Sequence, residues 1–432
     1  MATAGLLAQL PRLSQYDPGV IGEGGLDPMG LGAVADRIAD LLAPGVRARM
    51  SQPRFVTLSA VGAMAGQQLN GLVAEDGTTT ADIAFEWLVV EALVRLGKAE
   101  HVVGLPGSQK ARHAIAKGAR LNAQNYLRGA RVFGFTGVYR PFSVAESVID
   151  PRGLPGPSAG TLVDAWERDY QLRGFSTNQP GSEGAALRRD VAKAIEQSLV
   201  KGECAAPPTG QLLQRLASTT MPRGGRARER RELRRLVTGA DGEPRSVMTS
   251  LLMTALPEPG TPEHEIAATL ISRASGQTKV KLRCAINYEE AATLVNNTFR
   301  RLLIHSGAQA NGVLLEQDAA AMGHLQSAAR ELPDRVRRAI DSAAAYDDTL
   351  ALQVTTALSS FEPRMAAGDL FDTLISRHGD VQADKGKRTW LDQIAGGWCV
   401  RAQYREQSVA DDEWWVHPMR LHTLTQFLRE TR

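Results

Sequence analysis

The sequence predicts a mainly α-helical protein of several domains, with a winged-helix-like segment and minor β-structure. Apolar residues recur at helical spacing along most of the chain, whereas few stretches alternate with the period of a strand. The length of 432 residues exceeds the common domain size of about 100–200 residues, so two or three domains are expected. A hydrophobic content of 43% and a charged content of 22% are typical of globular proteins.

Three helices are predicted near the N-terminus. Residues 30–45 have apolar side chains at helical spacing and end at Pro44 and Gly45, which do not continue a helix. Residues 53–69 and 80–96 have helical patterns too. The last of these segments is apolar on nearly every side, so we expect it to be buried.

Residues 108–142 have the order of a winged helix. Helices are predicted over 108–118 and 122–131, with a tight turn between them. In 132–142, glycines separate aromatic and β-branched residues, which is typical of a small hairpin. In a winged helix the second helix enters the major groove of DNA and the hairpin lies on the backbone.

A turn-rich linker at 150–160 gives the first predicted domain boundary. We expect an N-terminal helical domain with the winged-helix-like segment, a middle helical domain with an Arg-rich helix, and a C-terminal helical domain. Their predicted bounds are 1–150, 151–310 and 311–432.

The middle and C-terminal parts are also expected to be largely helical. Helices are predicted over 161–172, 184–200, from Arg226 onward, and over most of 312–363. Residues 278–286 alternate apolar and basic side chains, which predicts a strand with one basic face. Asn287 is then expected to cap the helix that follows, because Glu290 stands three residues later.

Charge is distributed unevenly along a chain whose net charge is only +3. His101–Ala145 has seven Lys and Arg residues and no Asp or Glu, and 201–240 has nine basic and three acidic residues. These segments carry +7 and +6, so the rest of the chain carries −10. Such asymmetry indicates basic surfaces that meet a polyanion.

The acid-free segment supplies the first set of predicted nucleic-acid contacts. Its second predicted helix offers side chains that can pair with base edges: Asn122, Gln124, Asn125 and Arg128. The surrounding cations are predicted to contact phosphates: Lys110, Arg112, Lys117, Arg120, Arg131 and Arg140. The same pattern fits a solvated basic face without a partner, or a face that meets an acidic protein.

The stretch PRGGRARERRELRRL at 222–236 supplies the second set. As a helix it places arginines in two adjacent rows, which are Arg226, Arg230 and Arg234, and Arg228, Arg231 and Arg235. Such a helix can follow a phosphate backbone by charge alone. The alternative is a solvent-facing helix whose arginines pair with Glu229 and Glu232.

A third basic stretch lies near the C-terminus. Lys385, Lys387 and Arg388 stand close to Trp390, and a basic loop beside an aromatic ring can bind a phosphate or stack on a base. The other interpretation is a loop that packs Trp390 into the core, and the sequence favours it.

Signatures of catalysis, metals and cofactors are weak. Ser158 stands in a G-x-S-x-G pattern, but a loop precedes it, so we interpret the pattern as a helix start. Residues 30–35 match G-x-G-x-x-A without a preceding strand. His and Cys residues have no metal-binding spacing. We therefore predict no catalytic residue, no metal and no cofactor.

The sequence also predicts where in the cell the protein is found. No run of about 18 apolar residues occurs, so no membrane span is expected. The N-terminus lacks the pattern of a secretory signal. Three scattered cysteines argue against a disulfide framework, and we expect a cytoplasmic protein.

The segment LDPMGLGAVADRIADLLAPGVRARMSQPRF at 26–55 resembles the opening of an uncharacterised bacterial family. Members of that family are typically encoded beside restriction-like and other phage-defence genes. The shared features include a Gly-hydrophobic start, the helix end AD-LL-PG, and the pair Arg54-Phe55 where the family more often has Arg-Tyr. The likeness continues through VVGLPGS at 102–108 to RVFGF, and the stretch RH--VQ--KGKR-W near the C-terminus is also similar. The resemblance implies a defence context and assigns no catalytic residue.

These observations predict a non-catalytic nucleic-acid-binding subunit of a bacterial anti-phage defence complex, which recruits or positions an effector. Its expected partners are double-stranded DNA, more than RNA, and other subunits of the complex. The alternatives are a protein–protein scaffold of such an assembly and a metal-dependent nuclease with a carboxylate site built from distant segments. The main prediction requires that 108–140 and 223–235 fold next to each other as one docking surface.

Overall fold

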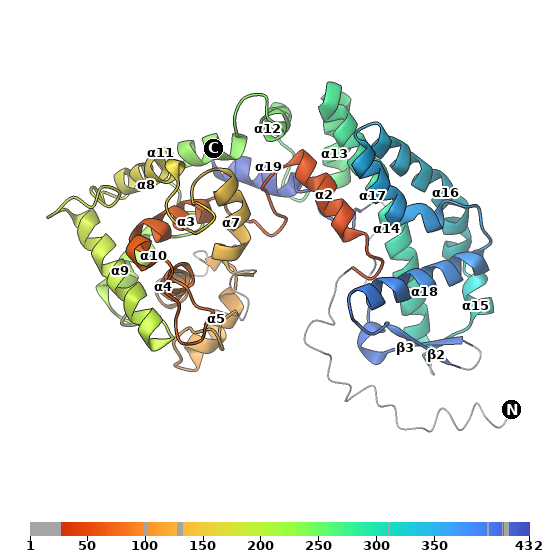
Figure 1. The fold of residues 1–432 in the computed structure, drawn as a ribbon, viewed down its shortest axis with the longest axis horizontal. Coiled ribbons are helices and arrows are strands. Elements are labelled where there is room, and N and C mark those ends of the chain that lie inside the picture. Colours follow the sequence, from red (N-terminus) through yellow and green to blue (C-terminus); the bar gives the residue numbers. More distant parts are fainter. Residues whose placement is uncertain are drawn as a thin grey trace. The chain divides into compact units, whose positions relative to one another are not determined.

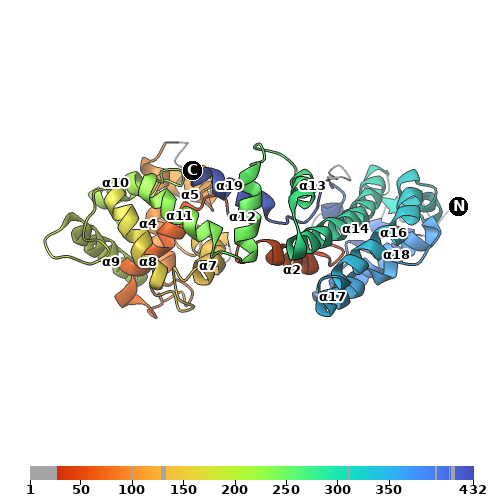
Figure 2. The ribbon, with the colours of Figure 1, turned by 90° about the horizontal axis from the view of Figure 1, so that it is seen from above.

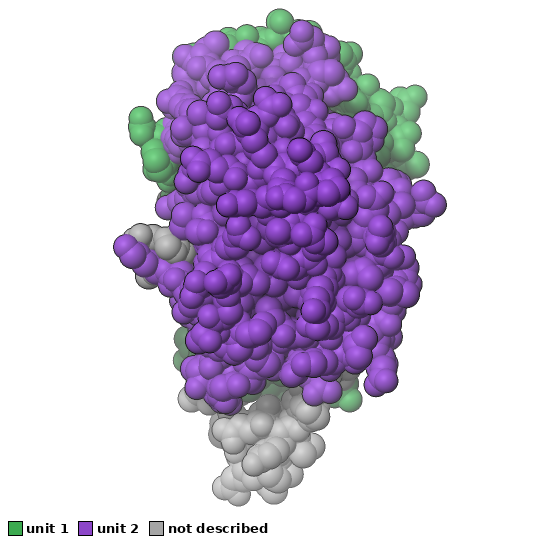
Figure 3. Space-filling model, turned by 90° about the vertical axis from the view of Figure 1, so that its left-hand side faces the viewer, with its two compact units in different colours: residues 1–42, 258–419 green, residues 43–257, 420–432 purple. Residues whose placement is uncertain are grey.

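The computed structural model describes residues 27–98, 102–127, 133–309, 312–394, 397–407, 409 and 414–432. The chain divides into two compact units, which are coloured separately in Figure 3. Unit 1 is Met1–Leu42 with Glu258–Met419, and unit 2 is Ala43–Pro257 with Arg420–Arg432. The predicted boundaries after residues 150 and 310 fall within the sequences of unit 2 and unit 1. The predicted class, mainly α with minor β, is confirmed (Figure 1).

Unit 2 is built from helices around α4 (Ala81–Leu96). Nearly every side chain of α4 is buried, as its sequence predicts, and α4 contacts α3, α5, α7, α9 and α10. The surrounding helices are α3 (Arg54–Ala65), α5 (Ser108–Ala116), α7 (Phe135–Ala145), α8 (Pro157–Asp169), α9 (Glu183–Lys201), α10 (Gln211–Thr219), α11 (Ala227–Thr238), α12 (Pro244–Thr254) and α19 (Leu421–Glu430), with a 3-10 turn η2 (Gln67–Leu69).

Unit 1 is built around the long helix α14 (Gly276–Ala308). This helix packs along α16 (Gly323–Ala344), and Figure 2 shows the two side by side. The other helices are α2 (Gly32–Leu42), α13 (Glu263–Arg273), α15 (Glu316–Ala320), α17 (Asp348–Leu358) and α18 (Ala367–Asp384), with 3-10 turns η4 (Ser359–Phe361) and η5 (Ala402–Tyr404).

A small antiparallel sheet completes unit 1. Its strands are β1 (Val313–Leu314), β2 (Leu391–Ile394) and β3 (Gly397–Val400), in the order β1-β3-β2. The register pairs Val313 with Cys399 and Leu391 with Val400. Among the described residues this is the only β-sheet, and the other β-pairings are isolated bridges.

The strand predicted over 278–286 is wrong, because these residues belong to α14. Leu282, Ala285 and Tyr288 are buried at helical spacing, so the alternation within nine residues coincides with part of a helical face. Asn287 is therefore not an N-cap. It lies inside the helix, which begins after Ser275.

The hairpin predicted over 132–142 is also wrong, because α7 occupies Phe135–Ala145. Phe135, Val138, Tyr139 and Phe142 are buried at the spacing of one helix face, and this face packs in the core. The winged-helix order is not confirmed.

The second helix of the predicted winged helix is replaced by turns over its described residues, 122–127. The Asn122 Oδ1 accepts hydrogen bonds from the backbone N–H groups of Gln124 and Asn125, each at 2.9 Å. The Asn125 side chain donates to the carbonyl of Arg120 at 2.7 Å. These local side-chain bonds compete with a helix for the same backbone groups.

Two other interpretations of short motifs are confirmed. Gly156 is the N-cap of α8 and Pro157 stands in its first turn, so Ser158 marks a helix start. Trp390 is buried, and its ring stacks on Tyr404 at a centroid distance of 4.4 Å. No helix in the described part of the chain is long and apolar enough to cross a membrane.

Candidate nucleic-acid interface and pocket

The division into units separates the charges of the chain. Unit 2 contains 31 basic and 20 acidic residues, so its net charge is +11. Unit 1 contains 19 basic and 27 acidic residues, so its net charge is −8. The near-neutral chain thus combines a strongly basic unit with an acidic one, and both of the main predicted basic segments belong to unit 2.

Helix α5 presents a cationic face to solvent. Lys110 and Arg112 on α5 and Lys117 at its C-cap are exposed, while Ala111 and Ala114 are buried. Within the described residues, these three basic side chains have no ion-pair or hydrogen-bond partner. They are available to an anion without losing an internal contact.

Arg120 has a different role, because it is directed into unit 2. Its Nε lies 3.1 Å from the Glu91 carboxylate, and Glu91 is fully buried. Its Nη2 donates to the Ala206 carbonyl and contacts the Cys204 Sγ at 3.2 Å. Arg120 therefore serves the interior of unit 2 and is not available as a phosphate contact.

The thiol of Cys204, next to Arg120, is buried. Burial raises its pKa to about 12, so the thiol stays protonated.

The described residues predicted to read base edges, Asn122, Gln124 and Asn125, do not lie in a helix. Asn122 and Asn125 are occupied by the turn described above, and only Gln124 is exposed among the described three. Arg128 and Arg131 lie outside the described residues. Over the described residues 122–127, the structure thus has no recognition helix where the sequence predicts one.

Helix α11 forms with one apolar and one basic face, as predicted. Leu233, Leu236 and Val237 are buried. Glu229 is buried as well, and its carboxylate lies 2.9 Å from the Nε of Arg54. Glu229 therefore neutralises an internal arginine and none of the seven in the Arg-rich stretch.

The arginines of α11 divide into exposed and internal ones. Arg228 and Arg235 are about 60% exposed and form single ion pairs, with Asp169 and Glu232, at 3.1 Å each. Arg231 is exposed and has no partner among the described residues. These three make up what we call the α11 row.

Two other arginines of this stretch, Arg234 and Arg226, make internal contacts. Arg234 donates to the Leu428 carbonyl at 2.7 Å and to the Thr431 hydroxyl at 3.0 Å, which fastens α11 to α19. Arg226, the N-cap of α11, lies over the ring of Tyr170 at 4.3 Å. Arg230 is half-buried.

The α5 face and the α11 row do not form one surface. In Figure 1, α11 lies at the top of unit 2 and α5 at its bottom. For the part of 108–140 in α5, the expectation that it folds next to 223–235 is therefore not met. Each basic helix has to be considered as a separate contact.

The third basic stretch belongs to the acidic unit 1. The Lys385 Nζ donates to the backbone carbonyl of Asp27 at 2.7 Å. Lys387 is half-buried and Arg388 is exposed, and both follow the C-terminus of α18. Trp390, the proposed stacking ring, is in the core, so this stretch lacks an exposed aromatic platform at that position.

His378 explains why Trp390 is held there. The backbone N–H of Trp390 donates to the His378 Nε2 at 2.9 Å, and the His378 Nδ1 lies 2.9 Å from the Pro28 carbonyl. Burial lowers the pKa of His378 to about 4, so the ring is neutral and Nδ1 carries the proton. This histidine is a structural residue.

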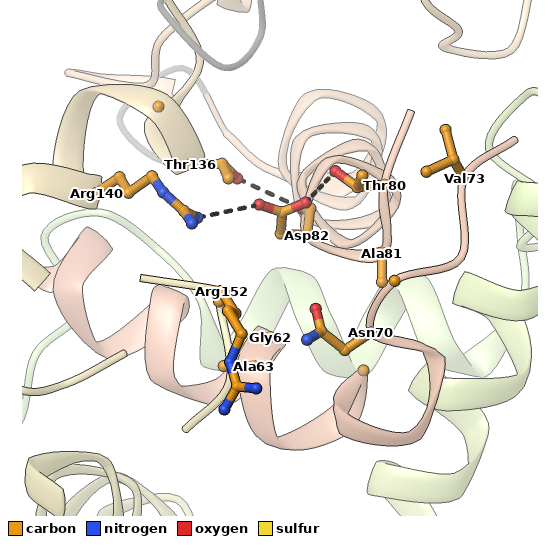
Figure 4. Close-up of a pocket in the computed structure, with 14 residues that line it drawn as sticks. Gly62, Ala63, Asn70, Val73, Thr80, Ala81, Asp82, Thr136, Arg140 and Arg152 are labelled. Atoms are coloured by element: carbon orange, nitrogen blue, oxygen red, sulfur yellow. Dashed lines mark hydrogen bonds and ion pairs between the residues drawn. The ribbon is translucent and has the colours of Figure 1, made fainter. Parts of the chain in front are cut away.

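Arg140 lines a pocket of about 480 Å³ in unit 2 (Figure 4). Its guanidinium lies 3.8 Å from the Asp82 carboxylate and donates to the Pro151 carbonyl at 2.6 Å. Arg152 and Asn70 line the same hollow from other segments. Asp82 also accepts a hydrogen bond from the Thr80 hydroxyl at the start of α4. No sequence motif indicates this pocket, because its lining residues come from four separate segments.

A buried carboxyl group lies behind one wall of the pocket. Thr136 lines the pocket, and its backbone N–H donates to Glu86 at 2.8 Å. The Tyr126 hydroxyl donates to the same carboxyl group at 2.8 Å. Burial raises the pKa of Glu86 to about 7, against the lowering effect of these hydrogen bonds.

Comparison of the chain with family models, with curated proteins and with solved structures finds no match. The resemblance to a phage-defence family, the effector and the partner subunits therefore stay predictions. In the described ranges, no three His, Cys, Asp or Glu side chains gather in a way that could hold a metal ion. Fold and charge define the class of the protein: a mainly helical chain of two units, of which one is strongly basic.

Proposed function

We propose that unit 2 binds the phosphate backbone of nucleic acid, double-stranded DNA in the first place, through the α11 row. The observation that supports this proposal is the separation of charge between the units, +11 against −8. A surface that neutralises phosphates releases condensed counterions, and this release drives binding without reading the base sequence.

The geometry of α11 makes the α11 row a better phosphate contact than the other basic segments. Arg228, Arg231 and Arg235 follow one another at helical spacing on the exposed side of a helix whose other side is anchored in the core. The guanidinium groups of Arg228 and Arg235 are about 60% exposed, although Arg228 pairs with the buried carboxylate of Asp169 and Arg235 with the partly exposed Glu232. The exposed sides of these guanidinium groups, together with Arg231, which is unpaired within the described residues, are available to phosphates.

The unpartnered cations of α5 form a second contact on another side of unit 2. Base-specific recognition is not part of the proposal, because the predicted recognition helix is absent from the described residues 122–127.

Binding of a labelled 15-base-pair duplex to the triple variant Arg228→Gln/Arg231→Gln/Arg235→Gln tests the proposal. Three lost phosphate contacts should weaken binding at least tenfold at about 100 mM salt and reduce the log–log salt slope by about 2–3.

The matched control is Arg330→Gln/Arg337→Gln/Arg338→Gln, which removes three exposed arginines from α16 of the acidic unit. It removes the same number of charges from a helix and should bind the duplex like wild type. Equal weakening by both triples would show a general charge effect and reject the α11 row. Wild-type binding to an acidic polypeptide but not to the duplex would assign the row to a protein partner.

A further inference from the structure

The pocket of unit 2 contains the starts of two helices. Thr80 and Asp82 stand at the N-terminus of α4, and Thr136 and Gly137 stand in the first turn of α7. The first N–H groups of a helix have no partner inside the helix and carry partial positive charge. The Thr136 N–H already donates to Glu86 and the Ile83 N–H to Asp82, so only the remaining first-turn N–H groups of these two ends contribute partial positive charge at the hollow.

Two guanidinium groups line the hollow, Arg140 beside Asp82 and Arg152 beside Asp150. Arg140 extends from α7, and Arg152 extends from the turn before α8 and is 78% exposed. A Cβ at Gly153 would lie 3.7 Å from the Arg140 Nη1 and 4.0 Å from the Asn70 Oδ1, so Arg140 and Asn70 both approach this glycine. Asp82 is the one carboxylate among the described lining residues.

We propose that this pocket binds a phosphate monoester. Guanidinium groups pair with phosphate oxygens in a bidentate manner, and helix N-termini are ready-made phosphate sites. The volume of about 480 Å³ lies within the usual range of small-molecule pockets, so the ester can carry a group of nucleotide size. Val73, Ala63 and Ala81 supply apolar wall for such a group. The proposal does not depend on DNA binding by the α11 row.

Calorimetric titration of the full chain with orthophosphate and with 5′-AMP tests the proposal, compared with the variant Arg152→Gln. Arg152 is exposed and pairs only with Asp150 among the described residues, so its loss should leave the fold intact. Removing a charge-assisted contact to phosphate should weaken binding of both probes about tenfold.

Two further variants make the test specific. Arg168→Gln removes an arginine with a similar exposed ion pair, to Asp164 at 3.1 Å, outside the pocket, and should change nothing. Asp82→Asn removes the repelling carboxylate and should tighten binding roughly 3- to 5-fold. A gain of affinity cannot result from partial unfolding, so this variant separates a site from a structural effect.

Comparison of oligonucleotides with and without a 5′-phosphate identifies the source of the ligand. A 5′-phosphate that strengthens binding, with loss of this effect in Arg152→Gln, assigns the pocket to strand ends. Binding of 5′-AMP without a 5′-phosphate effect assigns it to a free nucleotide.

The proposal is overturned if wild type binds neither orthophosphate nor 5′-AMP. It is also overturned if Arg152→Gln binds them as wild type does. The α11 triple variant should retain wild-type affinity for 5′-AMP, which keeps the outcome for the pocket separate from the outcome for DNA binding.

Discussion

Arg54 and Glu229 join the start of α3 to α11 through a buried ion pair. The Arg54 Nε lies 2.9 Å from Glu229, and its Nη2 donates to the Thr219 carbonyl at 2.7 Å. Both side chains are almost inaccessible to solvent. This pair holds α11 in place and so positions the exposed arginines of the helix.

Arg54→Met should destabilise unit 2 by about 3–5 kcal/mol, because it leaves the charge of Glu229 buried without a partner. Urea unfolding followed by circular dichroism measures the loss. The double variant Arg54→Met/Glu229→Leu removes both charges and should recover part of it. A single variant as stable as wild type would mean that the pair is not needed.

Glu86 should make the stability of unit 2 depend on pH. Its pKa is raised from an ordinary 4.5 to about 7, so the folded state binds a proton more tightly than the unfolded state. The free energy of unfolding is then highest below pH 4.5 and falls as pH rises toward 7, by roughly 3 kcal/mol.

Glu86→Gln removes this titration and keeps a neutral group of the same shape. Between about pH 4.5 and 7 the wild type should therefore lose stability relative to the variant, so the difference in unfolding free energy shrinks or changes sign. Below pH 4.5 the difference should stay constant. Urea unfolding at four pH values measures it. A difference that is the same at every pH would contradict the raised pKa.

Single residues show what the sequence could and could not predict about the site. The sequence predicts Lys110, Arg112 and Lys117 as exposed cations, and all three are exposed. The inward role of Arg120 depends on Glu91, 29 residues away, and that of Arg234 depends on Thr431, 197 residues away. Such partners are brought together by folding alone, so a local charge pattern cannot distinguish an anchoring arginine from a free one.

The contact between α3 and α4 shows how closely the elements of unit 2 pack. A Cβ at Gly62 of α3 would lie 2.5 Å from the Cδ1 of Phe85 on α4. No side chain fits at that distance, so α3 approaches α4 at a glycine. The same crossing places Gly62, Ala63 and Gly66 along the pocket.

Gly62→Ala should therefore destabilise unit 2 by about 1–3 kcal/mol, because the added methyl group overpacks the helix crossing. Gly160→Ala on α8 is the matched control, since a Cβ there meets nothing within 4 Å. It should be neutral or stabilise by up to about 1 kcal/mol through helix propensity. Thermal unfolding of the two variants compares them, and equal effects would contradict the tight crossing.

Helices with a long apolar face were predictable, and short ambiguous segments were not. The helix α4 and the Arg-rich α11 were expected from their patterns, and both are confirmed. The nine residues at 278–286 and the glycine-separated aromatics at 132–142 fit a strand locally, but each occupies a helix face that packs in the core. Tertiary packing overrides a short period-2 pattern.

At the scale of the whole chain, charge is divided between two structural units. The sequence indicates two basic segments, but the extent of the division becomes visible only when residues are assigned to units, because both units are discontinuous in sequence. The basic unit contains the α11 row, the α5 face and the pocket with its two arginines. The central claim is that this unit contacts phosphates at its surface.

The salt dependence of duplex binding by the wild-type chain tests this claim most directly. Anisotropy titrations from about 50 to 250 mM KCl should give a slope of log Kobs against log salt of about −3 to −6, because each phosphate contact contributes about −0.9. A slope near zero, or no binding at the lowest salt, would contradict the claim.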